Sequence, residues 1–254
     1  MWKKDVIGDM VSVELRGRLG NQLFQYAVCR IMAEKLDCDF SISDEWLGKN
    51  IFNVSLGKRP YHKSNVIFDE KVNKFNPEIF NIEPNTHLFG FWQSEKYFVG
   101  YETKIRQWLS LDVPNSDYLN EEYCTIHFRA QDGYLRENWV LPPNYFERAK
   151  EYVRNNINKD IKFVIVTDNP RLASHYFPKD IIISNDMKTD LSILTHSKNK
   201  IISNSSFSWW AAWLGLPDSN VVVAPNRWIN HNHTISSENT FYPHDIKTSN
   251  FVYV

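Results

Sequence analysis

The sequence is poor in several features that define large classes of protein. It contains only three cysteines, Cys29, Cys38 and Cys124, an odd number without metal-ligand spacing. This pattern indicates free thiols in a reducing compartment rather than a disulfide framework. The formal net charge is −1, so no overall basic field exists to attract nucleic acid or an anionic membrane. Any anionic ligand must therefore be held by local groups.

Long apolar runs are also missing. No uninterrupted apolar stretch approaches the roughly 20 residues that span a bilayer, and residues 1–10 carry two lysines and two aspartates, unlike a signal peptide. We therefore expect a soluble, cytoplasmic protein, with peripheral attachment to the inner membrane face left open. The one Asp-x-Asp sequence, Asp37-Cys38-Asp39, is interpreted as a turn between a helix and a strand, so no metal site is predicted.

Hydrophobic residues make up 43% of the chain and aromatic residues 15%, which is ample for a packed core. Apolar spacing predicts alternating strands and helices, the pattern of doubly wound α/β sheets. A linker-like composition over 111–117 places a boundary near residue 115, which gives domains 1–115 and 116–254, with the tail 229–254 unassigned and residues 43–90 without a clear period. Strands are predicted at 11–15, 123–129, 163–168, 181–183, 201–202 and 221–224, and helices at 22–36, 103–109, 144–155, 170–176 and 190–197. Residues 37–42 are predicted to form a turn and a strand, and residues 87–98 a strand followed by the start of a helix that Ser94 could cap.

One stretch in the second half has the composition of a strand, a tight turn and a buried helix. Ile201-Ile202 ends the strand, a polar cluster runs from Ser203 to Ser208, and three tryptophans follow within residues 209–213. The first backbone N–H groups of a helix lack partners within it, and the helix dipole is positive there, so such a turn binds anions readily. The alternative is that the serines only cap the helix, a common role of serine.

Further polar residues follow the ends of other predicted strands. His127 and Arg129 end one strand, and Thr167 and Asp168 end the next. In a parallel sheet these ends meet at the edge where nucleotides bind. Arginine can hold a diphosphate through paired hydrogen bonds, and the Asp168 carboxylate can accept from the N–H groups of guanine. Arg129 favours anion binding because an unpaired buried arginine is costly; for His127 the alternative is a hydrogen-bonded core position.

The first half carries a second loop of this kind, residues 16–21, between a predicted strand and a predicted helix. Its glycine spacing is not the dinucleotide fingerprint, so no NAD site is predicted. Arg16 and Arg18 suit a phosphate or a leaving group, and the alternative is that both are solvated surface charges. Farther along, Gln93 and Glu95 are candidate site residues near a strand end.

Five blocks of the chain are more specific when taken together. They are Gly17-Arg18-Leu19-Gly20-Asn21-Gln22-Leu23-Phe24-Gln25-Tyr26-Ala27, Phe91-Trp92-Gln93-Ser94-Glu95-Lys96-Tyr97-Phe98, His127-x-Arg129-x-x-Asp132, Asn204-Ser205-Ser206-Phe207-Ser208-Trp209-Trp210 and Ala224-Pro225-Asn226-Arg227-Trp228. They resemble the motifs of glycosyltransferase family 11, the α-1,2-fucosyltransferases, in the family's order and across most of residues 11–228.

The resemblance implies a GT-B-like α/β fold, with two Rossmann-like doubly wound domains facing each other across a cleft. It implies GDP-fucose as donor substrate, inversion at the anomeric carbon, and no metal or other cofactor. By position, Arg129 would contact the β-phosphate and the glycosidic oxygen, Asn21 would approach the same centre, and His127 and Asp168 would lie near the nucleoside. Together with the strand-end argument, the donor-binding candidates are Arg16, Arg18, His127, Asp168, Asn204, Ser205, Ser206, Phe207 and Ser208.

A carboxylate is expected to take the proton of the acceptor hydroxyl as an oxocarbenium-like centre forms at the sugar. Asp132 ranks first by position, ahead of Glu95 and Glu137. Two alternatives are that Asp132 orients Arg129 instead, and that no dedicated base exists. The catalytic candidates are therefore Arg129, Asp132, Asn21 and Glu95.

The sequence departs from the family at Ala130, where members often carry a second arginine. Arg18 or Arg227 would have to supply that charge. The chain is also shorter than expected for the family. The expected acceptor is galactose in an oligosaccharide or a bacterial surface polysaccharide, as in O-antigen biosynthesis, and no nucleic-acid partner is expected. The alternatives are transfer from another GDP-deoxyhexose and a non-catalytic nucleotide- or glycan-binding protein.

Overall fold

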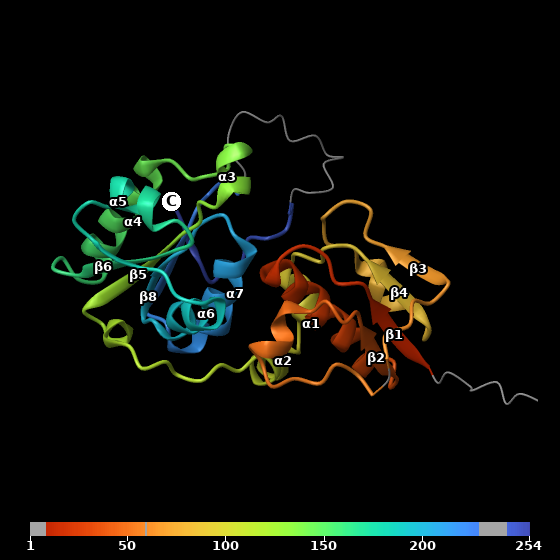
Figure 1. The fold of residues 1–254 in the computed structure, drawn as a ribbon. Helices are drawn as coiled ribbons and strands as arrows, with labels where there is room; N and C mark the ends of the chain where they lie inside the picture. Colours follow the sequence, from red (N-terminus) through yellow and green to blue (C-terminus); the bar gives the residue numbers. More distant parts are fainter. Residues whose placement is uncertain (1–8, 59, 229–242) are drawn as a thin grey trace, which may run out of the picture. The chain divides into compact units, whose positions relative to one another are not determined.

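The computed structural model describes residues 9–58, 60–228 and 243–254, without the side chain of Asp132. The chain forms two compact units (Figure 1). Of the described residues, unit 1 comprises those in 9–110 and 243–246. Unit 2 comprises residues 111–228 and Lys247–Val254. Each unit is built around its own parallel β-sheet.

Unit 1 has a four-stranded sheet in the order β2-β1-β4-β3, with every neighbouring pair parallel. The buried helix α1 packs on β1 and β2, which explains why apolar residues recur along it at helical spacing. The order reverses between β1 and β4, and in open α/β sheets this is where ligands bind, outside the carboxyl ends of the strands. The elements are β1 Met10–Val13, α1 Leu19–Lys35, β2 Asp39–Ile42, β3 Val66–Asp69, β4 Thr86–Phe89 and α2 Glu102–Trp108.

Residues 43–90, which show no sequence period, form short strands and 3₁₀ turns. Ser94 accepts a hydrogen bond from the Lys96 backbone N–H at 3.3 Å and caps the turn η3, as its position predicts. The 3₁₀ turns of this unit are η1 Leu47–Asn50, η2 Pro77–Asn81 and η3 Glu95–Phe98.

Unit 2 has a six-stranded parallel sheet in the order β10-β9-β8-β5-β6-β7. When its strands are numbered along the unit, this is the Rossmann order 3-2-1-4-5-6, and it reverses between β5 and β8. The elements are η4 Asp117–Leu119, β5 Tyr123–Phe128, α3 Asp132–Arg136, α4 Pro143–Asn156, β6 Lys162–Thr167, α5 Pro170–Tyr176, β7 Ile181–Ile183, α6 Met187–His196, β8 Asn199–Ile201, α7 Ser206–Leu214, η5 Leu216–Asp218, β9 Val221–Ala224 and β10 Val252–Tyr253.

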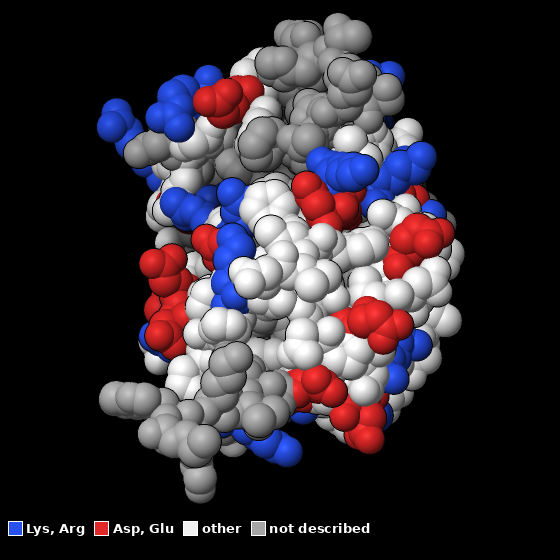
Figure 2. All heavy atoms as spheres, turned by 90° about the vertical axis from the view of Figure 1, so that its right-hand side faces the viewer, with Lys and Arg blue, Asp and Glu red and all other residues white. Residues whose placement is uncertain are grey.

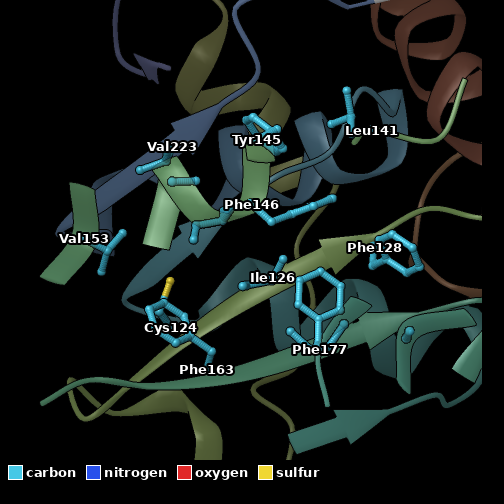
Figure 3. Close-up of a cluster of buried hydrophobic side chains, with 14 of the residues drawn as sticks. Cys124, Ile126, Phe128, Leu141, Tyr145, Phe146, Val153, Phe163, Phe177 and Val223 are labelled. Atoms are coloured by element: carbon cyan, nitrogen blue, oxygen red, sulfur yellow. The ribbon is translucent and has the colours of Figure 1, made fainter. Parts of the chain in front are cut away.

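The core of unit 2 lies between β5, β6 and helix α4 (Figure 3). Its centre is a triad of aromatic rings, Phe128, Phe146 and Phe177, whose centroids are 5.1–5.6 Å apart in edge-to-face contact. This geometry is the favourable one for aromatic pairs and adds to the free energy gained by burial. The core thus fixes the end of β5, immediately before Arg129.

The α/β prediction with parallel sheets is confirmed, and the stretch 201–214 is a strand, a turn and the buried helix α7. Two local predictions were incomplete. Helix α1 begins at Leu19, three residues before the predicted start at Gln22. The prediction began too late because Gly20 and Asn21 are weak helix formers, so the sequence does not mark them as helical. The five-residue helix α3 lies between Ala130 and Pro143, where the sequence predicts no helix; it is too short to show a period.

The last residues of the chain belong to both units. In unit 1, Asp245 accepts a hydrogen bond from the Phe75 N–H at 3.0 Å and pairs with Lys96, and the His244 N–H donates to the Asn73 carbonyl at 2.9 Å. In unit 2, β10 pairs with β9 at the edge of the sheet. The part of the tail at 229–242, which the sequence left unassigned, lies outside the described residues.

The face of the molecule shown in Figure 2 has acidic and basic side chains interspersed around a central uncharged area. Among the described residues, no helix is both long enough and apolar enough to cross a bilayer.

Gly215 lets α6 and α7 approach closely, and its replacement tests their packing. A Cβ atom at this position would lie 1.9 Å from the Thr195 carbonyl oxygen. We expect Gly215→Ala to lower the free energy of unfolding by about 1–3 kcal/mol, as overpacking does, measured by urea denaturation. At Gly133 an added Cβ meets nothing within 4 Å, so Gly133→Ala should change stability by less than about 0.5 kcal/mol. Equal stabilities of the two variants would contradict this account.

Candidate functional site

The first part of the site lies where the strand order of unit 2 reverses. His127 of β5 and Ser203 after β8 are joined by a hydrogen bond of 2.9 Å between Nδ1 and Oγ. The imidazole is buried, and its ring lies 5.5 Å from the Phe207 ring in the first turn of α7. Burial, with a smaller contribution from Arg129, lowers the pKa of His127 to about 3. The ring is therefore neutral and connects β5 to the turn before α7.

Arg129 and Asp168 follow β5 and β6 directly and form an ion pair. The last strand pair is Phe128 opposite Thr167, so the register itself places the two charged residues next to each other. Only 16% of the Arg129 side chain and 18% of the Asp168 side chain are exposed. At this burial, dissolved salt screens the pair much less than it screens a pair on the surface.

The backbone of Ala130 is held from the same neighbouring loop. Its N–H donates to Asp168 Oδ1 at 2.8 Å, and its carbonyl accepts from Asn169 Nδ2 at 3.1 Å. The Asn169 side chain also caps α5 by accepting from the Leu172 N–H. Two side chains therefore continue the pairing of β5 and β6 beyond the last strand residues.

Tyr134 links Arg129 to the start of α7. The guanidinium carbon lies 5.1 Å from the centroid of the Tyr134 ring, and the Tyr134 hydroxyl donates to the Asn204 carbonyl at 3.0 Å. Burial raises the pKa of Tyr134, and the charge of Arg129 opposes that rise. The phenol thus remains a neutral hydrogen-bond donor beneath the arginine.

The N-terminus of α7 forms the other side of this arrangement. Ser205 is the N-cap residue, but its side chain makes no capping hydrogen bond. Ser208 is fully buried and its hydroxyl donates to the carbonyls of Ser203 and Ser205, whereas Ser206 and Phe207 are partly exposed. Capping by Ser205 is therefore not what organises this turn.

Asn204 is buried beside this turn. Its Nδ2 donates to the Trp139 carbonyl at 2.9 Å. Its Oδ1 has no hydrogen-bond partner within the part of the chain that the structure describes. A buried acceptor without a donor is costly, so this oxygen is suited to a hydroxyl or N–H group of a ligand.

The three candidate bases lie in different settings. The Asp132 side chain lies outside the described part of the structure, although its backbone begins α3. Glu137 is exposed after α3, with its carboxylate 3.4 Å from Arg136. Glu95 belongs to unit 1, where its charge acts on Arg106, whose pKa is lowered mainly by burial.

The polar cluster of unit 1 also lies where its strand order reverses. Gln93, after β4, donates from Nε2 to Asn21 Oδ1 at 2.8 Å, and its own Oε1 accepts from Asn73 Nδ2 at 2.6 Å. Arg16 and Arg18 are exposed in the loop after β1, and the Arg16 guanidinium lies 4.4 Å from the Phe89 ring. The structure therefore places the donor-binding candidates Arg16 and Arg18 in unit 1, near the catalytic candidate Asn21, and the other donor-binding candidates in unit 2.

Two buried glutamines of α1 hold this loop, and sequence reasoning missed them. Gln25 accepts from the Arg16 N–H at 2.8 Å and donates to the Arg16 carbonyl, while Gln22 donates to the Gly17 carbonyl. Gly17 has φ +77°, the left-handed region that suits glycine. The signal was available, because Gln22 and Gln25 lie among the apolar residues Leu23, Phe24 and Tyr26 in a part of the helix that the structure buries.

Glu70 organises the loop that carries Gln93, and no sequence signal identified it. One Glu70 oxygen accepts from the Phe91 and Trp92 N–H groups at 2.9 Å each, and the other lies 3.2 Å from the Tyr97 hydroxyl. Trp92 is held at φ +60°, a strained conformation for a bulky residue. Burial raises the pKa of Glu70 to about 7.

Comparisons with known proteins agree with this architecture. The "Alpha-1,2-colitosyltransferase" of Escherichia coli is 24% identical, over 86% of this chain and 92% of that protein. The "O-antigen biosynthesis glycosyltransferase WbnK" of Escherichia coli is 25% identical, over 86% and 95%. Among solved structures, E. coli heptosyltransferase WaaC with ADP aligns over 96% of this chain and 92% of its own, with a TM-score of 0.51 and 8% identity.

The fold defines the class first: two α/β units with parallel sheets, as in GT-B glycosyltransferases. A model of the family "Glycosyl transferase family 11" matches residues 85–249, more than half of the chain. The protein belongs to glycosyl transferase family 11 and is a glycosyltransferase. Among the described residues, no group of three or more His, Cys, Asp and Glu side chains is arranged to hold a metal ion.

The pKa of Glu70 predicts a specific dependence of stability on pH. The folded value of about 7 exceeds the ordinary 4.5, so the folded state prefers the protonated carboxyl. This contribution is complete below pH 4.5 and is lost as the pH rises through about 7. Relative to Glu70→Gln, the wild type should lose about 3 kcal/mol of unfolding free energy over that range, measured by urea denaturation.

Glu83→Gln serves as the control because Glu83 is exposed in the same unit. Its difference from the wild type should stay constant with pH. A constant difference for Glu70→Gln as well would show that Glu70 ionises normally.

The neutrality of His127 can be followed directly. Its pKa of about 3, against an ordinary 6.5, predicts that the ring signals in NMR spectra do not shift between pH 8 and 5. His127→Gln identifies the signals by their loss. A titration midpoint between pH 5 and 7.5 would contradict the buried, neutral imidazole.

Proposed function

We propose that this protein transfers L-fucose from GDP-β-L-fucose to a galactose-type hydroxyl, with inversion to an α-1,2 linkage. GDP binds at the reversal of strand order in unit 2, beside β5, β8 and the start of α7. The proposal extends the membership of family 11 to a particular donor, acceptor and stereochemistry. The motif blocks that match the α-1,2-fucosyltransferases support that choice.

One observation carries the proposal: Tyr134 joins a half-buried arginine to the N-terminus of a helix. Its ring lies against the Arg129 guanidinium, and its hydroxyl donates a hydrogen bond to the backbone carbonyl of Asn204, the residue directly before the N-cap. Guanidinium groups and helix N-termini are both common phosphate-binding groups in proteins. Their connection through one side chain suits a diphosphate, which carries two neighbouring phosphoryl groups.

In the proposed reaction, the bond between the anomeric carbon and the β-phosphate oxygen breaks as the acceptor oxygen attacks from the opposite face. Arg129 and the positive end of α7 stabilise the charge that develops on the leaving GDP. The acceptor hydroxyl gives its proton to a carboxylate, with Asp132 the first candidate from its position in the motif. Asn204 Oδ1 is positioned to accept from a hydroxyl or N–H of the nucleoside. No metal ion takes part in this proposal.

A second donor has specific support. One relative is named an α-1,2-colitosyltransferase, and colitose is fucose without its 3-hydroxyl group. GDP-colitose is therefore the alternative donor. The name of the other relative, an O-antigen biosynthesis glycosyltransferase, supports a bacterial surface polysaccharide as the acceptor.

The proposal is tested by transfer from GDP-fucose and GDP-colitose to galactose-terminated oligosaccharides in EDTA. We expect metal-independent transfer and a loss of about 10²–10³-fold in kcat for Arg129→Ala, the usual effect of removing one group that stabilises developing charge. Arg154→Ala is the matched control. The Arg154 guanidinium, in helix α4, also lies on an aromatic ring, 4.9 Å from the centroid of Phe163, but Phe163 is at the start of β6 and not at its end.

The control variant should retain activity within about twofold. A higher kcat/KM with GDP-colitose than with GDP-fucose would identify GDP-colitose as the donor in place of GDP-fucose. GDP binding without transfer or hydrolysis of either donor would contradict the proposed function. Full activity of Arg129→Ala would refute the role of this arginine.

A further inference from the structure

The contacts of Asp168 differ from those expected of a residue that reads guanine. Its Oδ2 pairs with Arg129 Nη1, and its Oδ1 accepts the Ala130 N–H at 2.8 Å. Both oxygens are thus directed at the end of β5. A carboxylate that accepts from the N1–H and 2-amino groups of guanine needs both oxygens directed at the base.

The pairing with Arg129 uses one carboxylate oxygen only. Arginine and carboxylate often pair through two parallel hydrogen bonds, but here the backbone of Ala130 occupies the second oxygen. The guanidinium has five N–H donors, and the ion pair engages it at Nη1. Asp168 can therefore orient Arg129 without using all of the guanidinium N–H groups that would bind a diphosphate.

Asp168 and Tyr134 together define the orientation of the guanidinium. The carboxylate holds its Nη1 end, and the Tyr134 ring lies 5.1 Å from its central carbon. Tyr134 is itself fixed by its bond to Asn204. A planar group held at one end and on one face has little freedom to rotate, which is the condition for preorganised charge stabilisation.

We propose that Asp168 is the positioning residue of Arg129, which it orients toward the start of α7, and that it does not read the nucleobase. The inference rests on the proposed function, because it requires a donor whose diphosphate meets Arg129. Asp168 keeps the arginine in place before the donor arrives and shares it with the diphosphate afterward. A negative charge beside the diphosphate is unfavourable for binding and favourable for orientation, so the two effects have opposite signs.

Asp168→Asn separates these effects. The amide oxygen can still accept the Ala130 N–H, while the charge that holds Arg129 is lost. We expect kcat to fall about 10- to 100-fold, as misplaced catalytic groups do, while GDP binds no more weakly than to the wild type. Asp168→Glu keeps the charge and should recover part of the lost kcat.

Binding of GDP and IDP by calorimetry decides between orientation of Arg129 and recognition of guanine. IDP lacks the 2-amino group of guanine. If Asp168 only orients Arg129, the ratio of the two dissociation constants is the same in the wild type and Asp168→Asn. If Asp168 reads the 2-amino group, the ratio of the IDP to the GDP dissociation constant is above one in the wild type. A fall of this ratio toward one in Asp168→Asn, with weaker GDP binding, would overturn the proposal. This arm does not depend on which sugar the donor carries, so it remains decisive if fucosyl transfer is not found.

A double-mutant cycle tests whether Asp168 acts through Arg129. Lysine carries a point charge that needs no planar orientation, so in an Arg129→Lys background Asp168→Asn should change kcat by less than about twofold. Additive losses would show that Asp168 acts independently of Arg129 and would overturn the proposal.

Asp180→Asn is the matched control for loss of an ion pair. Asp180 pairs with Lys150 in the same unit, with 14% of each side chain exposed, directly before β7 and so at the opposite edge of the sheet. It should lower the midpoint of thermal unfolding without changing kcat or the ratio of GDP to IDP binding. The same kinetic losses in Asp180→Asn would show that Asp168→Asn acts only through stability, contrary to the proposal.

Discussion

The parallel pairing of β5 with its two neighbours is the constraint on which the rest of the site depends. Its register with β6 ends at Phe128 opposite Thr167, so the next residues, Arg129 and Asp168, become neighbours. Its pairing with β8 brings His127 to Ser203, at the turn before α7. A shift of one residue in either pairing would direct these side chains to the opposite face of the sheet. The buried aromatic triad that begins at Phe128 prevents such a shift.

The two units share one structural feature, a reversal of strand order with polar residues beside it. In each sheet the strand order reverses once, and the polar residues gather at that point: Asn21 and Gln93 in unit 1, His127 and Ser203 in unit 2. The two clusters differ in charge. Unit 1 has hydrogen-bonded side-chain amides and two exposed arginines in the loop after β1, whereas unit 2 has a guanidinium that is paired with a carboxylate.

The sequence predicted most of unit 2, because its strands and helices alternate with short connections and clear apolar periods. The bounds of α5, β7 and β9 agree with the structure, and each is marked by Pro170, three consecutive isoleucines or Pro225. The strand-end argument also identified Arg129 and Asp168, since it requires only that parallel strands end at one edge. It could not show that the two pair with each other, because that depends on the register. The sequence could not identify Glu70 either, because its hydrogen-bond partners lie 21–27 positions away, in a loop that no local pattern links to it.

The contribution of the last residues to both units has a consequence for folding during synthesis. His244 and Asp245 complete the packing of unit 1 around Asn73 and Phe75, and β10 completes the sheet of unit 2. A ribosome shields the most recently added residues in its exit tunnel, so neither unit can reach its final structure until residues 244–253 have emerged from the tunnel. Asn73 is also bonded to Gln93, which holds Asn21. The amide cluster of the first unit is therefore completed only by a segment that is synthesised about 150 residues after Gln93.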